Sequence, residues 1–157
     1  MSGPKYAIVD PADYERLRKY EWFAIKKGKL YYVRRHASGG KRKNGTLIYL
    51  HQEIIQVPKG MLIDHINHNP TDNRCANLRA ATHSQNICHR RKRSDAKYSK
   101  YKGITWRKDI RKWVARVTFE KKGIHLGFFK NEIEAAKAYD EAAKIYHGEF
   151  ACLNFQE

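Results

Sequence analysis

The sequence predicts an α+β protein built from two consecutive parts. Near the end of the 157-residue chain, residues that alternate between apolar and polar are followed by a helical period, which indicates a sheet backed by a helix. Near the middle, two short apolar segments flank a loop rich in asparagine, and a helical stretch comes after them. We therefore expect a first part that ends in strand, loop, strand and helix. The second part is expected to be a three-stranded antiparallel sheet packed on one helix.

The first sixty residues alternate between strand-forming and helix-forming segments. We expect a strand at 6–10, a short helix at 11–20, a hairpin at 21–35, a basic loop at 36–45 and an apolar strand that can pass into a helix at 46–55. Pro11 suits the first turn of the helix, because the N–H that proline lacks has no partner there in any case. Gly28 lies where the hairpin has to turn.

The last sixty residues predict one sheet and one helix. In KWVARVTF (112–119) the odd-numbered residues are apolar and the even-numbered ones are mostly polar, so one face of this strand is buried. The other expected elements are strands at 101–107 and 124–129, a turn at 120–123, and a helix that begins after an Asn131 cap and stops at Gly148. The many alanines of the helix allow it to pack closely on the sheet.

Charge is distributed unevenly over the second half of the chain. Residues 98–130 carry a net charge of +8, whereas residues 131–157 carry −4, so we expect a basic open face on the sheet and an acidic helix. The basic segment at 88–100 admits two interpretations, a solvated charge run or a chain that threads along a DNA groove. The arginines that would contact DNA in the second interpretation are Arg90, Arg91 and Arg93.

The whole chain has a net charge of +16, which makes a polyanion the expected partner. Nucleic acid is favoured over a membrane surface, because no apolar run approaches the length of a spanning helix and no basic amphipathic helix is evident. The first residues lack the apolar core of a signal peptide, so we expect a soluble intracellular protein. The three cysteines are widely spaced and indicate neither a disulfide framework nor a zinc knuckle.

The segment LIDHINHNPTDN (62–73) places an acid and a histidine directly after an apolar pair. Asp, Asn and Pro are common in turns, so one interpretation is a polar loop with incidental histidines. The other is a hydrolytic site in which Asp64 is a metal ligand and His65 is a base. A second short strand and a helix that bears Asn86 follow, and this order of elements can bring the three side chains together.

Hydrolysis of a phosphodiester requires a water molecule that loses its proton and a leaving oxygen that is stabilised. A neutral imidazole such as that of His65 can take the proton, because its pKa lies near the pH of the medium. A hard divalent cation, Mg²⁺ in the simplest case or else Mn²⁺, can stabilise the leaving oxygen. Such a cation favours oxygen ligands like the carboxylate of Asp64 and the amide of Asn86.

The remaining histidines and two tryptophans have plainer expected roles. His51 is expected to be buried and hydrogen-bonded, with a contact to the DNA backbone as the alternative. His83 and His89 are expected to be exposed residues of the helix rather than ligands. Trp113 is expected in the core, and Trp106 at the DNA surface.

IDHIN followed by NPTDNRCANLRAATHSQN resembles the motif of HNH endonucleases, in the subtype of phage and intron-encoded homing endonucleases that has asparagine in place of the last histidine. The resemblance implies a ββα-metal fold in which His65 is the general base and Asn77 fixes the loop that orients it. Asp64 and Asn86 would hold the metal. Other loop residues expected to bond the loop or a phosphate are Asn73, Arg74 and Arg79. Products with 5′-phosphate and 3′-hydroxyl ends, and a location in the cytoplasm of a bacterial or phage-infected cell, are also implied.

A second resemblance covers about residues 98–155. YKGITWRKDIRKWVARV, IHLGFFKNEIEAAKAYDEAAKIYHGEF and LNF are similar to the DNA-binding domain of ethylene-response-factor (Apetala) proteins, known in plant transcription factors and also fused to homing endonucleases. In that family the sheet lies in the DNA major groove. The positions that the resemblance places against DNA are Lys102, Arg107, Arg116, Thr118 and His125. Thr105 and His125 replace plant contact residues, so the sequence preference of the plant proteins does not carry over.

Together these patterns predict an HNH nuclease domain at 1–90 with its core at about 48–90, a basic linker at 91–99 and an Apetala-type DNA-binding domain at 100–157. The predicted function is divalent-metal-dependent cleavage of double-stranded DNA at a preferred site, as by a homing endonuclease. A monomer with one active site would nick DNA, whereas a double-strand break would require a homodimer or two successive cuts. Two alternatives stay open, a DNA-binding regulator with an inactive nuclease site and a protein directed at RNA.

Overall fold

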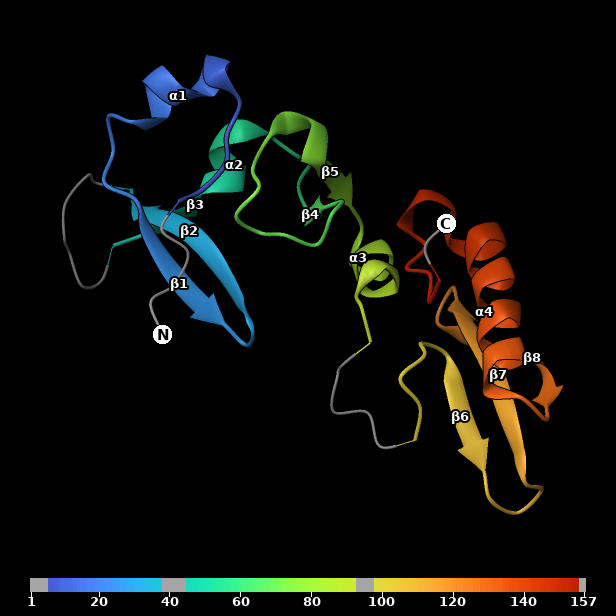
Figure 1. Ribbon diagram of the computed structural model, residues 1–157. Helices are drawn as coiled ribbons and strands as arrows, with labels where there is room; N and C mark the ends of the chain where they lie inside the picture. The colour runs from blue at the N-terminus through green and yellow to red at the C-terminus, as the bar shows by residue number, and fades with distance from the viewer. Residues whose placement is uncertain (1–5, 38–44, 93–97, 156–157) are drawn as a thin grey trace. The chain divides into compact units, whose positions relative to one another are not determined.

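The computed structural model describes residues 6–37, 45–92 and 98–155. The contacts of the chain divide it into two compact units, residues 1–82 and residues 83–157. Both units combine helices with antiparallel strands, which confirms the predicted α+β class (Figure 1). Among the described residues, no helix has the length and apolar character needed to cross a membrane.

The first unit contains a short helix and a three-stranded antiparallel sheet. Its elements are α1 (Pro11–Leu17), β1 (Phe23–Lys27), β2 (Leu30–His36), β3 (Leu47–Tyr49) and α2 (Leu50–Ile54), with sheet order β1-β2-β3. Gly28 has a φ of 62° in the turn between β1 and β2, a conformation that glycine adopts without strain. The helix, the hairpin and the passage from strand to helix confirm the sequence prediction. The strand predicted at 6–10 is reduced to one bridge, between Ile8 and Asp72.

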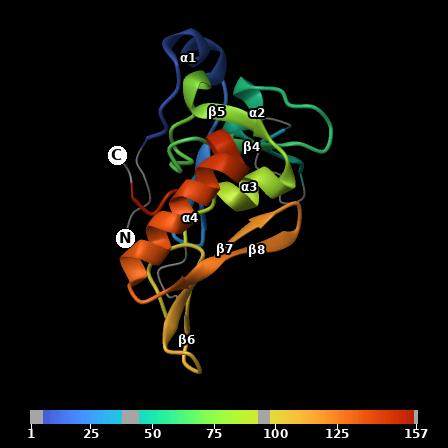
Figure 2. The same ribbon diagram turned by 90° about the vertical axis from the view of Figure 1, so that its right-hand side faces the viewer.

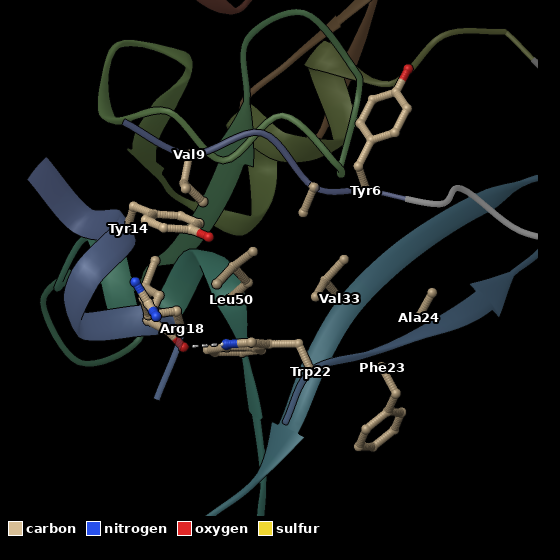
Figure 3. Close-up of a pocket in the computed structure, with 11 residues that line it drawn as sticks. Tyr6, Val9, Tyr14, Arg18, Trp22, Phe23, Ala24, Val33 and Leu50 are labelled. Atoms are coloured by element: carbon tan, nitrogen blue, oxygen red, sulfur yellow. Dashed lines mark hydrogen bonds between the residues drawn. The ribbon is translucent and has the colours of Figure 1, made fainter. Parts of the chain in front are cut away.

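One face of this sheet and α1 enclose a pocket of about 280 Å³. The indole N–H of Trp22 donates to the carbonyl of Leu17 at 2.9 Å and so links the end of α1 to the start of the sheet. Phe23, Ala24 and Val33 are among the residues that line the pocket (Figure 3). Because consecutive residues of a strand point to opposite faces, Ala24 lies on one face of the sheet and Phe23 on the other.

The remainder of the first unit is a two-stranded sheet joined by a long loop. It consists of β4 (Leu62–His65), a 3-10 turn η1 (Cys75–Asn77) and β5 (Leu78–Ala81). The strands pair from Leu62 with Ala81 to His65 with Leu78. The helix α3 (His83–His89) follows β5 directly and belongs to the second unit. Strand, loop, strand and helix thus follow in the predicted order.

The rest of the second unit is a three-stranded antiparallel sheet with one long helix against it (Figure 2). The elements are β6 (Ile104–Arg107), β7 (Lys112–Phe119), β8 (Lys122–Phe129), α4 (Glu132–His147) and η2 (Gly148–Phe150). The Asn131 side chain accepts from the N–H of Ile133 at 2.7 Å, which confirms the predicted cap. β8 starts earlier than expected, because Glu120 and Lys121 both take positive φ and close the hairpin as a two-residue turn.

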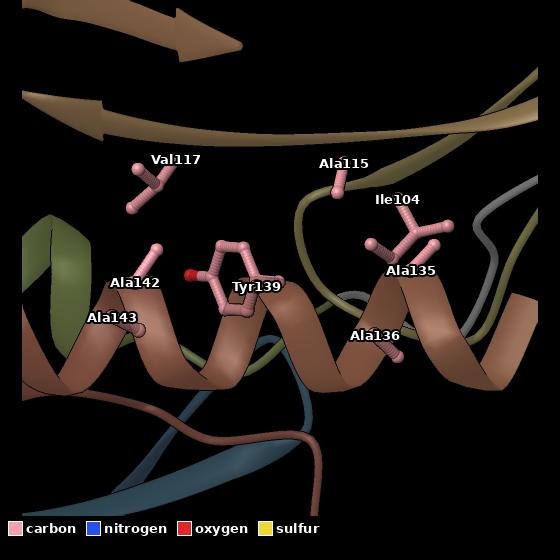
Figure 4. Packing of buried hydrophobic residues seen from close by; sticks show 8 residues of the cluster. All are labelled: Ile104, Ala115, Val117, Ala135, Ala136, Tyr139, Ala142 and Ala143. Carbon is pink, nitrogen blue, oxygen red and sulfur yellow. The ribbon is translucent and has the colours of Figure 1, made fainter. Parts of the chain in front are cut away.

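The core of the second unit lies between the sheet and α4 (Figure 4). Ala115 and Val117 are fully buried there, while Arg116 and Thr118 between and beyond them are exposed. The predicted alternation therefore holds from Ala115 to Thr118, but not over the whole strand, because Val114 is buried and Phe119 is 38% exposed. Trp113 packs against the core as predicted, and Trp106 lies edge-on to it with ring centroids 5.0 Å apart. A contact of Trp106 with DNA stays a prediction.

Candidate active site

Asp64 and His65 lie at the end of β4, where β5 pairs with it. The register places Asp64 opposite Arg79 and His65 opposite Leu78. Both functional candidates are buried, with exposed fractions of 6% for Asp64 and 7% for His65. Because a buried polar group is unfavourable unless it is hydrogen-bonded, the loop and strand around them have to supply partners.

Asn77 holds together the two sides of the loop that follows His65. Its Nδ2 donates to Asn67 Oδ1 at 3.0 Å and to the backbone carbonyl of Asp72 at 2.7 Å. Its Oδ1 accepts from the backbone N–H of Asn67 at 3.0 Å. Its carbonyl also accepts from the N–H of Ile66 at 2.9 Å. Such an arrangement is what a loop-fixing role requires, and that role for Asn77 stays a prediction.

His65 also bonds to a loop residue. Its Nε2 lies 3.3 Å from Asn73 Oδ1, and Asn73 Nδ2 donates to the carbonyl of Pro70 at 3.3 Å. Since the Asn73 NH₂ group is directed to Pro70, its oxygen faces the imidazole and requires a donor, so we assign the proton of neutral His65 to Nε2. The lone pair is then on Nδ1, which becomes the basic atom. Asn73 was expected to bond the loop, but no local pattern pointed to its contact with a histidine eight residues away.

A second histidine ring, that of His51 in α2, lies against His65. The two ring centroids are 5.3 Å apart and the rings are nearly perpendicular, at 83°. His51 stacks in turn on Tyr49, with centroids 5.3 Å apart and planes only 11° from parallel. Burial, with smaller contributions from the charges of His65 and Lys27, lowers the pKa of His51 to about 4. His51 is therefore neutral at neutral pH and acts as a packing surface for His65.

The electrostatic surroundings of His65 favour its neutral form. Burial lowers its pKa, and this effect outweighs the hydrogen bond to Asn73 and the charges of Asp64 and Asp72, which act in the opposite direction. A histidine with a lowered pKa is neutral at pH 7, and only the neutral imidazole can accept a proton. His65 is thus in the protonation state that a general base requires, and its role as the base stays a prediction.

Asp64 is held in place by an ion pair. Its Oδ2 accepts from Arg79 Nε at 3.0 Å, and only 11% of the Arg79 side chain is exposed. Carboxylate oxygens are the ligands that hard divalent cations prefer, so the chemistry of Asp64 fits a metal ligand. Asn86, the second predicted ligand, is half-buried on α3 and provides an amide oxygen of the same class.

Comparisons with known proteins point to one family. A family model described as HNH endonuclease matches residues 56–87, which contain the whole β4–β5 hairpin and the first part of α3. An uncharacterized HNH endonuclease of Acanthamoeba polyphaga mimivirus is 30% identical over 150 residues, which cover 95% of this chain and 74% of the viral protein. The chain belongs to the HNH endonuclease family.

Two further relatives align with different shares of this chain and of their own length. Protein 3.8 of Escherichia phage T7 is 33% identical to this HNH protein over 95 residues, 60% of this chain and 77% of the phage protein. An APETALA2-like protein of Oryza sativa is 47% identical over 60 residues, 37% of this chain. These residues span 14% of the length of the rice protein, so the similarity concerns one segment of it.

Most residues predicted to contact DNA are exposed, either on strands of the second unit or directly after α3. The exposed ones on the strands of the second unit are Arg107, Arg116, Thr118 and His125. Arg90 and Arg91 are exposed directly after α3, and Arg93 lies outside the described residues. All of these contacts stay predictions.

Lys102 differs from the other predicted DNA contacts. Its ammonium donates to the backbone carbonyls of Cys88 and Arg90, the second at 2.7 Å, at the C-terminal end of α3. Burial lowers its pKa. A cation is favourable there because the last carbonyls of a helix have no partners within the helix. Lys102 thus ties the end of α3 to the segment before β6, and its contact with DNA stays a prediction.

The two histidines that were expected to be exposed on α3 differ in their burial. His83 is exposed, as predicted. The prediction for His89 was wrong, because this side chain is only 5% exposed. The helix α3 packs against η2 of the same unit, a contact between distant parts of the sequence that helical periodicity does not reveal.

We expect the first unit to lose stability as the pH falls from about 6.5 to 4. Folded His51 has a pKa of about 4, below the usual 6.5, so the unfolded chain binds a proton in this window that the folded chain does not. The free energy of unfolding is therefore highest above pH 6.5 and declines below it, by up to about 3 kcal/mol at pH 4. His65 acts in the same direction, because burial also lowers its pKa.

Urea unfolding at pH 7 and pH 5 measures this effect. His51→Phe keeps an aromatic ring but cannot titrate, so its stability should fall less between the two pH values. Equal losses in the variant and the wild type would show that His51 is not the source.

Proposed function

We propose that this protein is a divalent-metal-dependent endonuclease that hydrolyses double-stranded DNA at a preferred site, in the manner of a homing endonuclease. The observation that carries the proposal is the state of His65. It is buried, its pKa is lowered by burial, and its Nε2 is held by Asn73. Membership of the HNH endonuclease family supports the same conclusion.

In the proposed reaction, Nδ1 of His65 takes a proton from the attacking water molecule. Asn73 holds the opposite nitrogen, and Asn77 holds the loop, so the lone pair keeps one direction. Asp64 and Asn86 are the proposed ligands of Mg²⁺ or Mn²⁺, which when bound stabilises the charge on the phosphate and on the departing 3′ oxygen.

The second unit is the proposed reader of the DNA. Residues 98–130 carry most of its positive charge, and the open face of its sheet exposes arginines. We assign the nuclease domain to residues 1–90, a linker to 91–99 and an Apetala-type DNA-binding domain to 100–157. The family match, which ends inside α3, supports assigning this helix to the nuclease domain.

Supercoiled plasmid incubated with the purified chain tests the proposal. We expect nicked or linear DNA with Mg²⁺ or Mn²⁺ and no cleavage in EDTA, with 5′-phosphate and 3′-hydroxyl ends on the products. Nicked plasmid that accumulates before linear plasmid would indicate a monomer that cuts one strand at a time. Binding of duplex DNA without cleavage under any divalent ion would contradict the proposal and favour a regulator. Competition by single-stranded RNA in preference to duplex DNA would favour an RNA-directed protein.

A further inference from the structure

One face of the sheet in the first unit carries cations and aromatic rings. Strand pairing places Phe23, Arg34 and Tyr49 in one row across β1, β2 and β3. Tyr32 and Lys27 lie further along the same face, because side chains two residues apart in a strand point to the same side. We call these five residues the Lys27–Arg34 face.

Each cation of the Lys27–Arg34 face lies over aromatic rings. Lys27 Nζ is 4.8 Å from the ring centroid of Tyr49 and 5.6 Å from that of Tyr32. Arg34 Cζ is 5.3 Å from the ring centroid of Phe23. The hydrogen bond from Lys27 lowers the pKa of Tyr49, with smaller contributions from the charges of Lys27 and Arg34. Positive charge is thus gathered on this face and held by rings.

A line of rings leads from this face to the candidate base. The rings of Tyr32 and Tyr49 have centroids 6.1 Å apart. Tyr49 stacks on His51 at 5.3 Å, and His51 contacts His65 at 5.3 Å. The face and His65 are therefore joined by consecutive ring contacts within the first unit.

The carboxylates of the described residues do not pair with the cations of the face. Within the described residues, neither Lys27 nor Arg34 forms an ion pair with a carboxylate. Glu53 pairs at 2.5 Å with Arg35, which neighbours Arg34 in β2 and therefore points to the other side of the sheet. An anion from outside the protein is the remaining counterpart for the two cations.

We propose that the Lys27–Arg34 face binds the sugar-phosphate backbone of duplex DNA next to the bond to be cut. Lys27 and Arg34 neutralise phosphates and release counterions, and the hydroxyl groups of Tyr32 and Tyr49 donate to phosphate oxygens. This inference rests on the proposed nuclease function, and it adds to the contacts proposed for the second unit a contact made by the first. These phosphate contacts orient the strand at His65 without reading its sequence.

The salt dependence of binding tests the proposal. Duplex DNA is titrated with the full chain in EDTA at several salt concentrations, and fluorescence anisotropy gives the binding constant. Lys27→Gln combined with Arg34→Gln should reduce the slope of log K against log salt by about 2, and the affinity at 0.1 M salt by roughly tenfold or more. The matched control is Lys26→Gln combined with Arg18→Gln. It removes the same charge from the other side of the sheet and from the C-cap of α1, and it should leave the slope unchanged.

Hydroxyl-radical footprints locate the contact. The Lys27/Arg34 variant should lose protection of the nucleotides beside the nick made by the wild type, while protection farther away persists. Equal slopes for the variant and its control, or an unchanged footprint at the nick, would overturn the inference while wild-type cleavage leaves the proposed function intact. If the wild type fails to cut DNA with every divalent ion tested, the proposed nuclease function fails. The placement of the face beside a scissile bond then fails with it. The slopes in EDTA then still decide whether the face binds DNA.

Discussion

Changing His65 to alanine is expected to slow single-turnover DNA cleavage by about a thousand-fold while duplex binding is retained. The imidazole is buried, its Nε2 lies 3.3 Å from Asn73 Oδ1, and burial lowers its pKa. A neutral base is therefore present at pH 7 with its lone pair held in one direction, and alanine removes it. Cleavage of a labelled duplex at saturating protein measures the rate, and a gel shift in EDTA measures binding.

His83→Ala is the matched control for this experiment. His83 also lies within the region that the family model matches, but its side chain is exposed. The His83→Ala variant should cleave DNA at the rate of the wild type. His65→Gln, which keeps a polar side chain in the buried position, should be as slow as His65→Ala. Cleavage by both His65 variants at rates within about tenfold of the wild type would mean that another group is the base.

Gly103→Ala is expected to destabilise the second unit by about 3 kcal/mol or more. Gly103 has a φ of 76°, and a Cβ atom there would lie 2.0 Å from Tyr139 Cδ2 and 2.7 Å from the carbonyl oxygen of Arg116. Tyr139 is 2% exposed and lies between α4 and the sheet (Figure 4), so its ring cannot move away without opening the core. A shift of the backbone instead would weaken the hydrogen bond from Arg116 N–H to the Gly103 carbonyl, now 2.9 Å long.

Gly148→Ala separates the steric contribution from the conformational one. Gly148 also has a positive φ, 54°, but nothing lies within 4 Å of a Cβ atom built there. Its φ of 54° and ψ of −129° lie outside the left-handed helical region, so the substitution should have only a conformational effect, about 1–3 kcal/mol and smaller than that of Gly103→Ala. Urea unfolding followed by circular dichroism gives both free energies. Equal losses in the two variants would show that the Tyr139 contact does not determine the sensitivity of Gly103.

Local patterns of the sequence were sufficient to predict most of the secondary structure. The cap at Asn131 and the alternation from Ala115 to Thr118 depend on neighbours only two or three residues away, and the structure has both. The alternation fails at Val114, which is buried, and at Phe119, which is exposed. The early start of β8 was not predicted, because it depends on positive φ at Glu120 and Lys121, neither of which is a glycine. Periodicity also failed for His89, whose burial depends on a distant segment.

The candidate site divides in the same way. The sequence motif singled out Asp64 and His65, and the structure places them side by side in one short strand. The sequence motif did not reveal that Asp64 is paired with Arg79, although both residues had been noted. This ion pair depends on the register between β4 and β5. Nor did the motif reveal the contact of His51 with His65, which joins residues of different elements.

By itself, the sequence determined the α+β class, the order of the elements and the residues capable of proton transfer and metal binding. These properties follow from residue types and short spacings, which act within a few residues along the chain. Only the tertiary structure decided which nitrogen of His65 is basic, because Asn73 approaches the ring across a folded loop. It likewise decided that Lys102 holds the end of α3 and that Lys27 and Arg34 share a face. Such contacts depend on strand register and packing between segments that are distant in the sequence, and no local pattern encodes them.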